Sequence, residues 1–296
     1  MPHRIALGLC LGSALVLSAG CKGGEDGDDE AGSTLYERLG EEPGIEAVVT
    51  DAVVNRIAAD PKINAYFLND DVDVGVTITC LVNQLGNISG GPQAYPGSDC
   101  RDMKESHEGL GISEQDFLDL ADHFVGALTD AGVAQADIDT IVAALVDMQA
   151  DIVEDPSNDA TIYQRVGRKP GIQAVVTDFY TTVSSDPAIM GLFAGADQVR
   201  FEACLTRQLC AIDGPCLYGN EATMLDPSYG GSVCKDMVSA HEGMTLTVED
   251  FQAFADDLDM VLAAAETEIS TQDEDAIMAV LDPLCAELVD EPGNCP

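Results

Sequence analysis

The sequence predicts an all-α protein built from two copies of one helical unit. Apolar residues recur three or four positions apart, as from Ile172 to Val183, which is the spacing of one face of a helix. Hydroxyl residues stand before such segments with an acidic or amide partner three positions later, as in a helix capping box. No run alternates apolar and polar residues, so we expect no sheet.

The second half of the sequence repeats the first. TLYERLGEEPGIEAVVTD at Thr34 matches TIYQRVGRKPGIQAVVTD at Thr161, and AADPKINAYF matches SSDPAIMGLF. Further along, CRDMKESHEGLGISEQDF matches CKDMVSAHEGMTLTVEDF. We therefore expect two domains, at residues 34–155 and 160–296, linked by EDPSNDA.

Each unit is predicted to contain an ordered series of helices. An apolar stripe runs from Phe117 to Leu128, its counterpart starts at Phe251, and a closing helix runs from Ile138 to Met148. The Gly-Pro elements SGGPQAYPG and DGPCLYG interrupt the helices. The predicted capping pairs are Thr34 with Glu37, Thr161 with Gln164, Ser113 with Asp116 and Thr247 with Asp250.

The first 33 residues predict export. IALGLCLGSALVL has the length of a signal-peptide core and is shorter than the roughly 20 residues of a membrane span. It ends in LSAGC, which resembles a bacterial lipoprotein processing site, so we expect residues 1–20 to be removed and Cys21 lipidated; the alternative is an ordinary secretory signal. Lys22 favours the outer membrane, facing the periplasm or the exterior. The Gly- and acid-rich composition of residues 21–33 predicts a flexible linker.

The strong negative charge limits the partners. There are 13 basic against 53 acidic residues, a formal charge of −40. Nucleic-acid binding needs Lys and Arg to neutralise phosphate, so it is excluded as a general function. Contact with anionic lipid is also disfavoured, which leaves the lipid anchor as the expected membrane attachment. The remaining consequence of the charge is solubility.

The cysteines indicate an oxidising compartment. Without Cys10, which is removed, and Cys21, eight remain, an even number. A metal cluster is the alternative, but the spacings lack Cys-x-x-Cys. Cys80 aligns with Cys204 and Cys100 with Cys234, so the simplest pairing is Cys80 with Cys100 and Cys204 with Cys234. Cys210 and Cys216 flank the Gly-Pro turn of the second copy only, and Cys285 with Cys295 would join the tail to its helix.

Two of the four histidines, His107 and His241, lie in the same tripeptide, His-Glu-Gly. A lone histidine is usually solvated or structural, but duplication in a matching frame indicates a shared role. The glutamates that follow them point elsewhere on a helix and receive no role. His123 aligns with Asp257 and is expected to be a structural residue.

Five motifs occur in the same order in both copies: LYERLG…GI.AVV, ADP…YF, GGP..Y.G, RDM…H.GLGI and the terminal helix. This arrangement resembles the group 1 truncated haemoglobins over almost all of both units. The resemblance implies a short globin fold, a two-over-two helical sandwich around a haem. It also implies haem b, up to two per chain, with His107 and His241 binding the iron from the proximal side. Cys-x-x-Cys-His is absent, so covalent haem is not expected.

The resemblance also implies which residues line the haem pockets. On the distal side the second copy has Tyr180 as a hydrogen-bond donor, whereas Val53 or Val54 takes its place in the first copy. One residue is inserted before ADP in the first copy, which leaves the register open there. The other expected pocket residues are Leu81, Leu205, Thr77 and Phe201 on the distal side, Phe67 and Phe193 on the haem face, and Tyr95 and Tyr218 near the haem edge.

Three functions are consistent with these features. The first is reversible binding of oxygen or another diatomic gas outside the cytoplasm. The second is dioxygenation of nitric oxide, which would need an external redox partner because no G-x-G-x-x-G flavin fingerprint is present. The third is a haem-free structural lipoprotein. The sequence assigns no role to the insert from Asn220 to Ser232 in the second copy.

Overall fold

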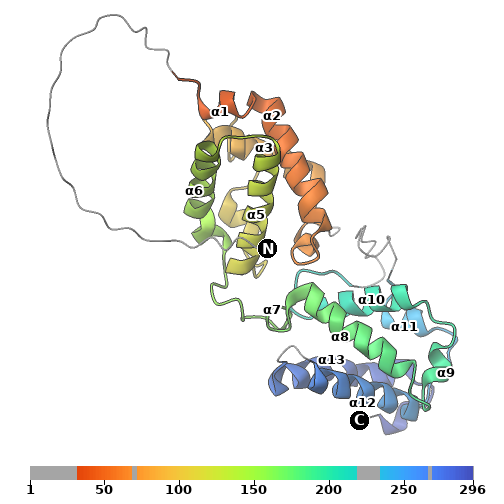
Figure 1. The fold of residues 1–296 in the computed structure, drawn as a ribbon. Helices are drawn as coiled ribbons and strands as arrows, with labels where there is room; N and C mark the ends of the chain where they lie inside the picture. Colours follow the sequence, from red (N-terminus) through yellow and green to blue (C-terminus); the bar gives the residue numbers. More distant parts are fainter. Residues whose placement is uncertain (1–31, 69–71, 219–233, 266–268, 296) are drawn as a thin grey trace, which may run out of the picture. The chain divides into compact units, whose positions relative to one another are not determined.

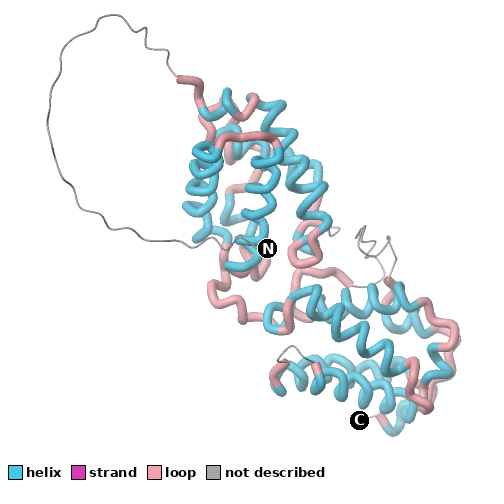
Figure 2. The backbone as a smooth tube through the Cα atoms, viewed as in Figure 1, coloured by secondary structure: helices cyan, strands magenta, loops and turns pink. Residues whose placement is uncertain are grey.

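The computed structural model describes residues 32–68, 72–218, 234–265 and 269–295, and residues 33–296 form one unit of contacts. Within these ranges the backbone is helix and loop, with one isolated bridge between Ser113 and Asp155 and no strand (Figure 2). The all-α prediction is confirmed. The expected signal peptide, Cys21 and the Asn220–Ser232 insert lie outside the described residues and stay predictions.

The first repeat begins with the short helix α1 and ends with the long helices α5 and α6 (Figure 1). Its elements are α1 (Leu35–Arg38), α2 (Glu41–Thr50), the π-helix η1 (Asp51–Arg56), the 3₁₀ turns η2 (Ile57–Ala59) and η3 (Asn64–Tyr66), α3 (Val74–Ile88), α4 (Met103–His107), α5 (Glu114–Asp130) and α6 (Gln135–Ile152).

The second repeat follows the same order. Its elements are α7 (Ile162–Arg165), α8 (Arg168–Val183), α9 (Met190–Phe193), α10 (Gln198–Cys210), α11 (Met237–His241), α12 (Val248–Ala264), α13 (Thr271–Leu288) and the 3₁₀ turn η5 (Pro292–Asn294). All four predicted capping boxes are present, at Thr34, Ser113, Thr161 and Thr247. No helix among the described residues is both long and apolar enough to cross a bilayer.

Two helix pairs build each repeat. In the first, α2 packs on α3 and α5 packs on α6; in the second, α8 packs on α10 and on α12, which packs on α13. Apolar side chains between these helices form the cores, because their helical spacing gives each helix one apolar face. Val49 and Ile57 are fully buried in the first core, and Phe179 and Leu258 in the second.

An equivalent ion pair joins the first helix of each repeat to the last. Arg38 Nη2 donates to Asp137 Oδ1 at 2.7 Å, and Arg165 Nη2 donates to Asp273 Oδ1 at 2.6 Å. In both pairs the Nε–H also donates to the same carboxylate, so the contact is bidentate. These pairs hold the chain entering each repeat against its closing helix.

The extra residue of the first repeat is absorbed as a π-helix. Asp51–Arg56 forms η1, where the second repeat continues the regular helix α8. A π-turn accommodates one additional residue within a helix. Ala52, Val53 and Ile57 therefore all stay in the core, while Val54 is 49% exposed. This resolves the register left open by the sequence: Val53 is the core residue.

Charged side chains at the start of α8 bond to the first repeat. Arg168 Nη1 donates to Asp116 Oδ1 at 2.9 Å and to Asp119 Oδ2 at 2.8 Å. Lys169, which is 1% exposed, donates from Nζ to Asn64 Oδ1 at 3.2 Å. The first repeat has EEPG where the second has RKPG, so these contacts belong to the second repeat alone.

Candidate functional site

The two histidines of the repeated tripeptide end matching short helices. His107 is the last residue of α4 and His241 is the last residue of α11. Each helix starts at an aspartate cap, Asp102 or Asp236, whose side chain accepts from the backbone N–H three residues on. Helix α4 packs on α6, and α11 packs on α13. Both histidines are half-buried.

The same hydrogen bond orients both imidazoles. His107 Nδ1 lies 2.6 Å from the carbonyl oxygen of Met103, and His241 Nδ1 lies 2.7 Å from that of Met237. A carbonyl only accepts, so Nδ1 carries the proton and the lone pair of Nε2 is free for a metal. No described residue makes a hydrogen bond to either Nε2. A backbone carbonyl of this kind is a common outer partner of a metal-binding histidine.

In the second repeat the structure brings the predicted distal residues together. The ring centroids of Tyr180 and Phe201 are 5.3 Å apart, and Phe193 lies 6.5 Å from Tyr180 and 5.7 Å from Phe201. Leu205, on the same helix as Phe201, is buried in the core. Tyr180 is half-buried, and its hydroxyl makes no hydrogen bond within the described part of the chain.

The first repeat has fewer free polar side chains at the matching positions. Val53 is 2% exposed and replaces the phenol with an aliphatic side chain. The hydroxyl of Thr77 donates to the carbonyl of Asp73 at 3.0 Å and is thus occupied within helix α3. Leu81 and Phe67 pack against the core of the repeat. The distal helix of this repeat therefore presents mainly apolar groups.

The two tyrosines expected near the haem edge lie close to the caps of the histidine helices. Burial and the charge of Asp102 raise the pKa of Tyr95 above its ordinary value. Burial and the charge of Asp236 do the same to the pKa of Tyr218. Each phenol is consequently neutral and able to donate a hydrogen bond at any physiological pH.

Two further contacts at the site were not foreseen. The carboxylate of Glu154 accepts from the backbone N–H of Gly109 at 2.6 Å and of Gly111 at 2.7 Å, just after His107. Phe254 packs edge-on against Phe179, next to Tyr180 in sequence, with centroids 4.8 Å apart. Helical spacing marked Phe179 and Phe254 as core residues, but no sequence signal joins Glu154 to glycines more than forty positions away.

Four disulfides join the cysteines in the pairs expected from the alignment. They are Cys80–Cys100, Cys204–Cys234, Cys210–Cys216 and Cys285–Cys295. A disulfide sulfur is no thiolate, so these cysteines do not form a metal cluster. In the described residues no three His, Cys, Asp or Glu side chains are grouped to hold a metal ion.

A surface hollow of about 320 Å³ among the described residues does not contain the histidines. It is lined by Lys62, Ser113, Gln115, Asn158, Gln164, Gly167, Arg168 and Pro170. None of the residues expected to line a haem pocket is among them.

Comparison with known proteins identifies the family. The model of the bacterial-like globin family matches residues 34–154 and again residues 161–289. Group 1 truncated hemoglobin GlbN of a Nostoc species is 33% identical over 121 residues, which are 41% of this chain and 98% of that protein. The protein of the same name from Mycolicibacterium paratuberculosis is 28% identical over 132 residues, 44% of this chain and 91% of the relative.

One solved structure is also similar to part of the chain. The truncated hemoglobin of Tetrahymena pyriformis, in its Fe(III) form, is 24% identical, covers 41% of this chain and 98% of its own, and superposes with a TM-score of 0.37. The family model accounts for most of the chain, in two successive matches that each contain one of the paired histidines. The chain therefore belongs to the bacterial-like globin family, is related to the group 1 truncated hemoglobins, and carries two globin domains in tandem.

Proposed function

We propose that each domain binds haem b, with Nε2 of His107 and of His241 as the proximal ligands, and that the protein reversibly binds oxygen or another diatomic gas. The observation that carries the proposal is the bond from Nδ1 to the carbonyl four residues earlier, present in both domains. It fixes the tautomer that a metal-binding imidazole needs. The relatives, which are hemoglobins by name, support the choice of ligand.

The surroundings of the histidines suit an apolar planar ligand. Leu110 and Met244 follow the histidines by three positions and are 46% and 38% exposed. Large apolar side chains left exposed on the segment that follows each proposed ligand favour an apolar partner that covers them. Haem iron held by one proximal histidine offers its opposite position to a gas.

The two domains differ in what they offer a bound gas. In the second, the hydroxyl of Tyr180 is a free donor among aromatic rings, where a hydrogen bond is stronger than in water. In the first, Val53 offers no donor, and the hydroxyl of Thr77 already donates a hydrogen bond to the carbonyl of Asp73. We therefore expect the second domain to hold a polar gas complex longer than the first.

The expected location is the cell envelope, with Cys21 as the lipid anchor. The apolar run before LSAGC and the four disulfides support export to an oxidising compartment. Replacing Cys21 with Ala should move the protein from the membrane fraction to the soluble fraction of the envelope. Retention in the membrane fraction would contradict lipidation at this residue.

Haem binding is tested by titrating the haem-free chain with haemin and counting haem per chain from the Soret band. We expect two haems, one after His107→Ala or His241→Ala, and none in the double variant. His123→Ala is the matched control, because this histidine is paired with Asp60 and should leave the count at two. A colourless wild-type chain, or a double variant that keeps its Soret band, would overturn the proposal.

Nitric oxide dioxygenation is distinguished from gas carriage by a second measurement. The oxygenated protein is mixed with nitric oxide, and nitrate is measured with and without an added electron donor. A carrier releases oxygen without sustained turnover. Repeated turnover that requires the donor would make the protein an enzyme with an external redox partner.

A further inference from the structure

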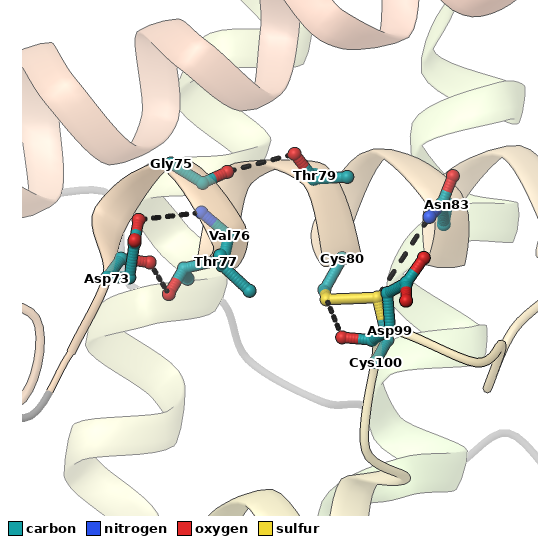
Figure 3. The surroundings of a disulfide bond; sticks show 9 residues. All are labelled: Asp73, Gly75, Val76, Thr77, Thr79, Cys80, Asn83, Asp99 and Cys100. Atoms are coloured by element: carbon teal, nitrogen blue, oxygen red, sulfur yellow. Dashed lines mark hydrogen bonds between the residues drawn. A yellow bond between two sulfur atoms is a disulfide. The ribbon is translucent and has the colours of Figure 1, made fainter.

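In each domain one disulfide joins the helix that carries the distal residues to the segment that leads into the histidine helix. Cys80 lies on α3, immediately before Leu81, and is bonded to Cys100, seven residues before His107 (Figure 3). Cys204 lies on α10 before Leu205 and is bonded to Cys234, again seven residues before its histidine. The Cα–Cα distances are 5.5 and 5.3 Å.

The histidine helices have little structure of their own. Helices α4 and α11 have five residues each and contain no buried residue. A helix this short is not stable by itself in water, because fixing the backbone of the first turn loses more entropy than its few hydrogen bonds offset. Its position must therefore come from attachments at its ends and from the helix it packs on. The disulfide supplies such an attachment two residues before each aspartate cap.

The second attachment differs between the domains. In the first, Glu154 accepts from the backbone N–H groups of Gly109 and Gly111 and so holds the chain that leaves α4. In the second, Asp290 takes the matching position and donates its backbone N–H to the carbonyl of Leu246. Its side chain makes no bond to the amides of residues 243–245 in the described part of the chain. The second histidine helix thus depends more on its disulfide.

We propose that Cys80–Cys100 and Cys204–Cys234 are positioning pairs that fix the distance between the distal helix and the histidine helix and thereby retain haem. This inference rests on the proposed function. It assigns to these cysteines a role at the site in addition to their contribution to stability. The chain contains an internal control for the first domain, because Cys285–Cys295 ties helix α13 to the tail of the second domain.

The test measures haem loss from the full chain to an excess of apomyoglobin. His241→Ala restricts haem to the first domain and His107→Ala restricts it to the second. Cys80→Ala with Cys100→Ala should speed haem loss from the first domain at least tenfold. Cys204→Ala with Cys234→Ala should speed loss from the second by a larger factor. The control, Cys285→Ala with Cys295→Ala, should change the rate of haem loss from the first domain less than twofold even if it lowers the melting temperature.

A haem-free readout separates positioning from general stability. Hydrogen exchange is followed in the apo chain at residues 103–108 and along helices α5 and α6. Loss of Cys80–Cys100 should abolish protection at residues 103–108 while α5 and α6 stay protected. Equal rates of haem loss from the first domain for the Cys80–Cys100 and Cys285–Cys295 variants, or unchanged exchange at residues 103–108, would overturn the inference. If the double variant does not fold, the intact chain is compared before and after reduction by a phosphine.

The two proposals fail in different ways. A wild-type chain that takes up no haem refutes the proposed function, and the hydrogen-exchange experiment still decides whether the disulfide positions the histidine helix. A chain that binds two haems but loses them at a rate independent of Cys80–Cys100 and Cys204–Cys234 refutes only the positioning role.

Discussion

Nε2 of His123 lies 2.8 Å from Oδ2 of Asp60 in the first domain, and the second domain lacks this pair. Asp257 stands where the first domain has His123, and Asp186 stands where it has Asp60. Asp257 is 8% exposed, and its Oδ2 has no hydrogen-bond partner among the described residues. The bond between a histidine and an acid in the first domain is therefore replaced by two acids in the second, and the charge of Asp186 acts on Asp257.

Replacing Asp257 should stabilise the second domain. Burial, and then the charges of Asp186 and Asp256, raise the pKa of Asp257. A pKa that is higher in the folded than in the unfolded chain means that the folded chain binds the proton more tightly. The free energy of unfolding is therefore higher at low pH and falls as the pH rises through the folded-state pKa. Asp257→Asn should remove this dependence and raise the melting temperature at pH 7 by about 3 °C, the shift that ~1 kcal/mol gives in a domain of this size.

Asp257→His is the stronger test, because it rebuilds the pair of the first domain beside Asp186. It should raise the melting temperature most near pH 6, where histidine is charged and the aspartate is ionised. The measurement is calorimetry of the full chain between pH 5 and 8, with Glu249→Gln, an exposed acid on the same helix, as the control. A lower melting temperature for Asp257→His at pH 6 would contradict this interpretation of the contact.

The pair between Arg165 and Asp273 should have the opposite pH dependence. The hydrogen bond from Arg165 lowers the pKa of Asp273, whose side chain is 3% exposed. A carboxylate whose pKa is lowered in the folded chain stabilises the domain above its ordinary pKa near 4. This contribution is lost as the pH falls through the folded-state pKa. Asp273→Asn should lower the free energy of unfolding by about 1–3 kcal/mol at pH 7, as expected for a hydrogen bond to a charged group.

Urea unfolding at pH 7 and pH 3 measures this effect. The difference between Asp273→Asn and the wild type should shrink at pH 3, because the carboxylate of the unfolded wild-type chain is then mostly protonated and must lose this proton on folding. A difference that stays constant or grows at low pH would show that the pair does not stabilise the domain through its charge.

Local signals explain why the helices could be predicted. Capping boxes and apolar stripes act within four residues, so Thr34, Ser113, Thr161 and Thr247 mark the starts of helices without knowledge of the fold. Aligning the two copies gave Cys80–Cys100 and Cys204–Cys234 as the simplest pairing, whereas the other two disulfides belong to the second copy alone and were expected from the turn and the tail that they flank.

Features that depend on distant partners could not be predicted. The insertion before ADP was visible, but its form as a π-helix depends on the need to keep Val53 and Ile57 in one core. RKPG locally indicates an exposed, charged helix start. The burial of Lys169 and the pairing of Arg168 with Asp116 depend on residues of the other repeat, which no local pattern reveals.

Arg168→Ala should destabilise the protein because it removes the guanidinium that donates to two buried acids. Asp116 and Asp119 have side chains that are 3% and 11% exposed, and Arg168 donates to both. Breaking such a buried pair by removing one member typically costs about 3–5 kcal/mol. The loss should be smaller when Asp119→Ala is added, because one unpaired charge is then removed. Urea unfolding of the four members of this cycle measures the coupling, and additive losses would contradict it.

Tyr180→Phe should shorten the lifetime of bound oxygen in the second domain. Its hydroxyl is the unbonded polar group among the rings of Phe193 and Phe201. A hydrogen bond to a polarised ligand contributes about 1.5–3 kcal/mol, which corresponds to a roughly tenfold to hundredfold faster dissociation when it is lost. Stopped-flow oxygen dissociation from the His107→Ala background, where only the second domain binds haem, measures this rate.

The first domain supplies the comparison for this prediction. With His241→Ala, oxygen should leave the Val53-containing pocket at a rate close to that of Tyr180→Phe in the second domain, since both then lack a phenol donor. Tyr163→Phe is the matched control, because its hydroxyl donates to the carbonyl of Lys62 and should not affect the ligand. Slower dissociation from the first domain than from the intact second domain would show that Tyr180 does not donate to the bound gas.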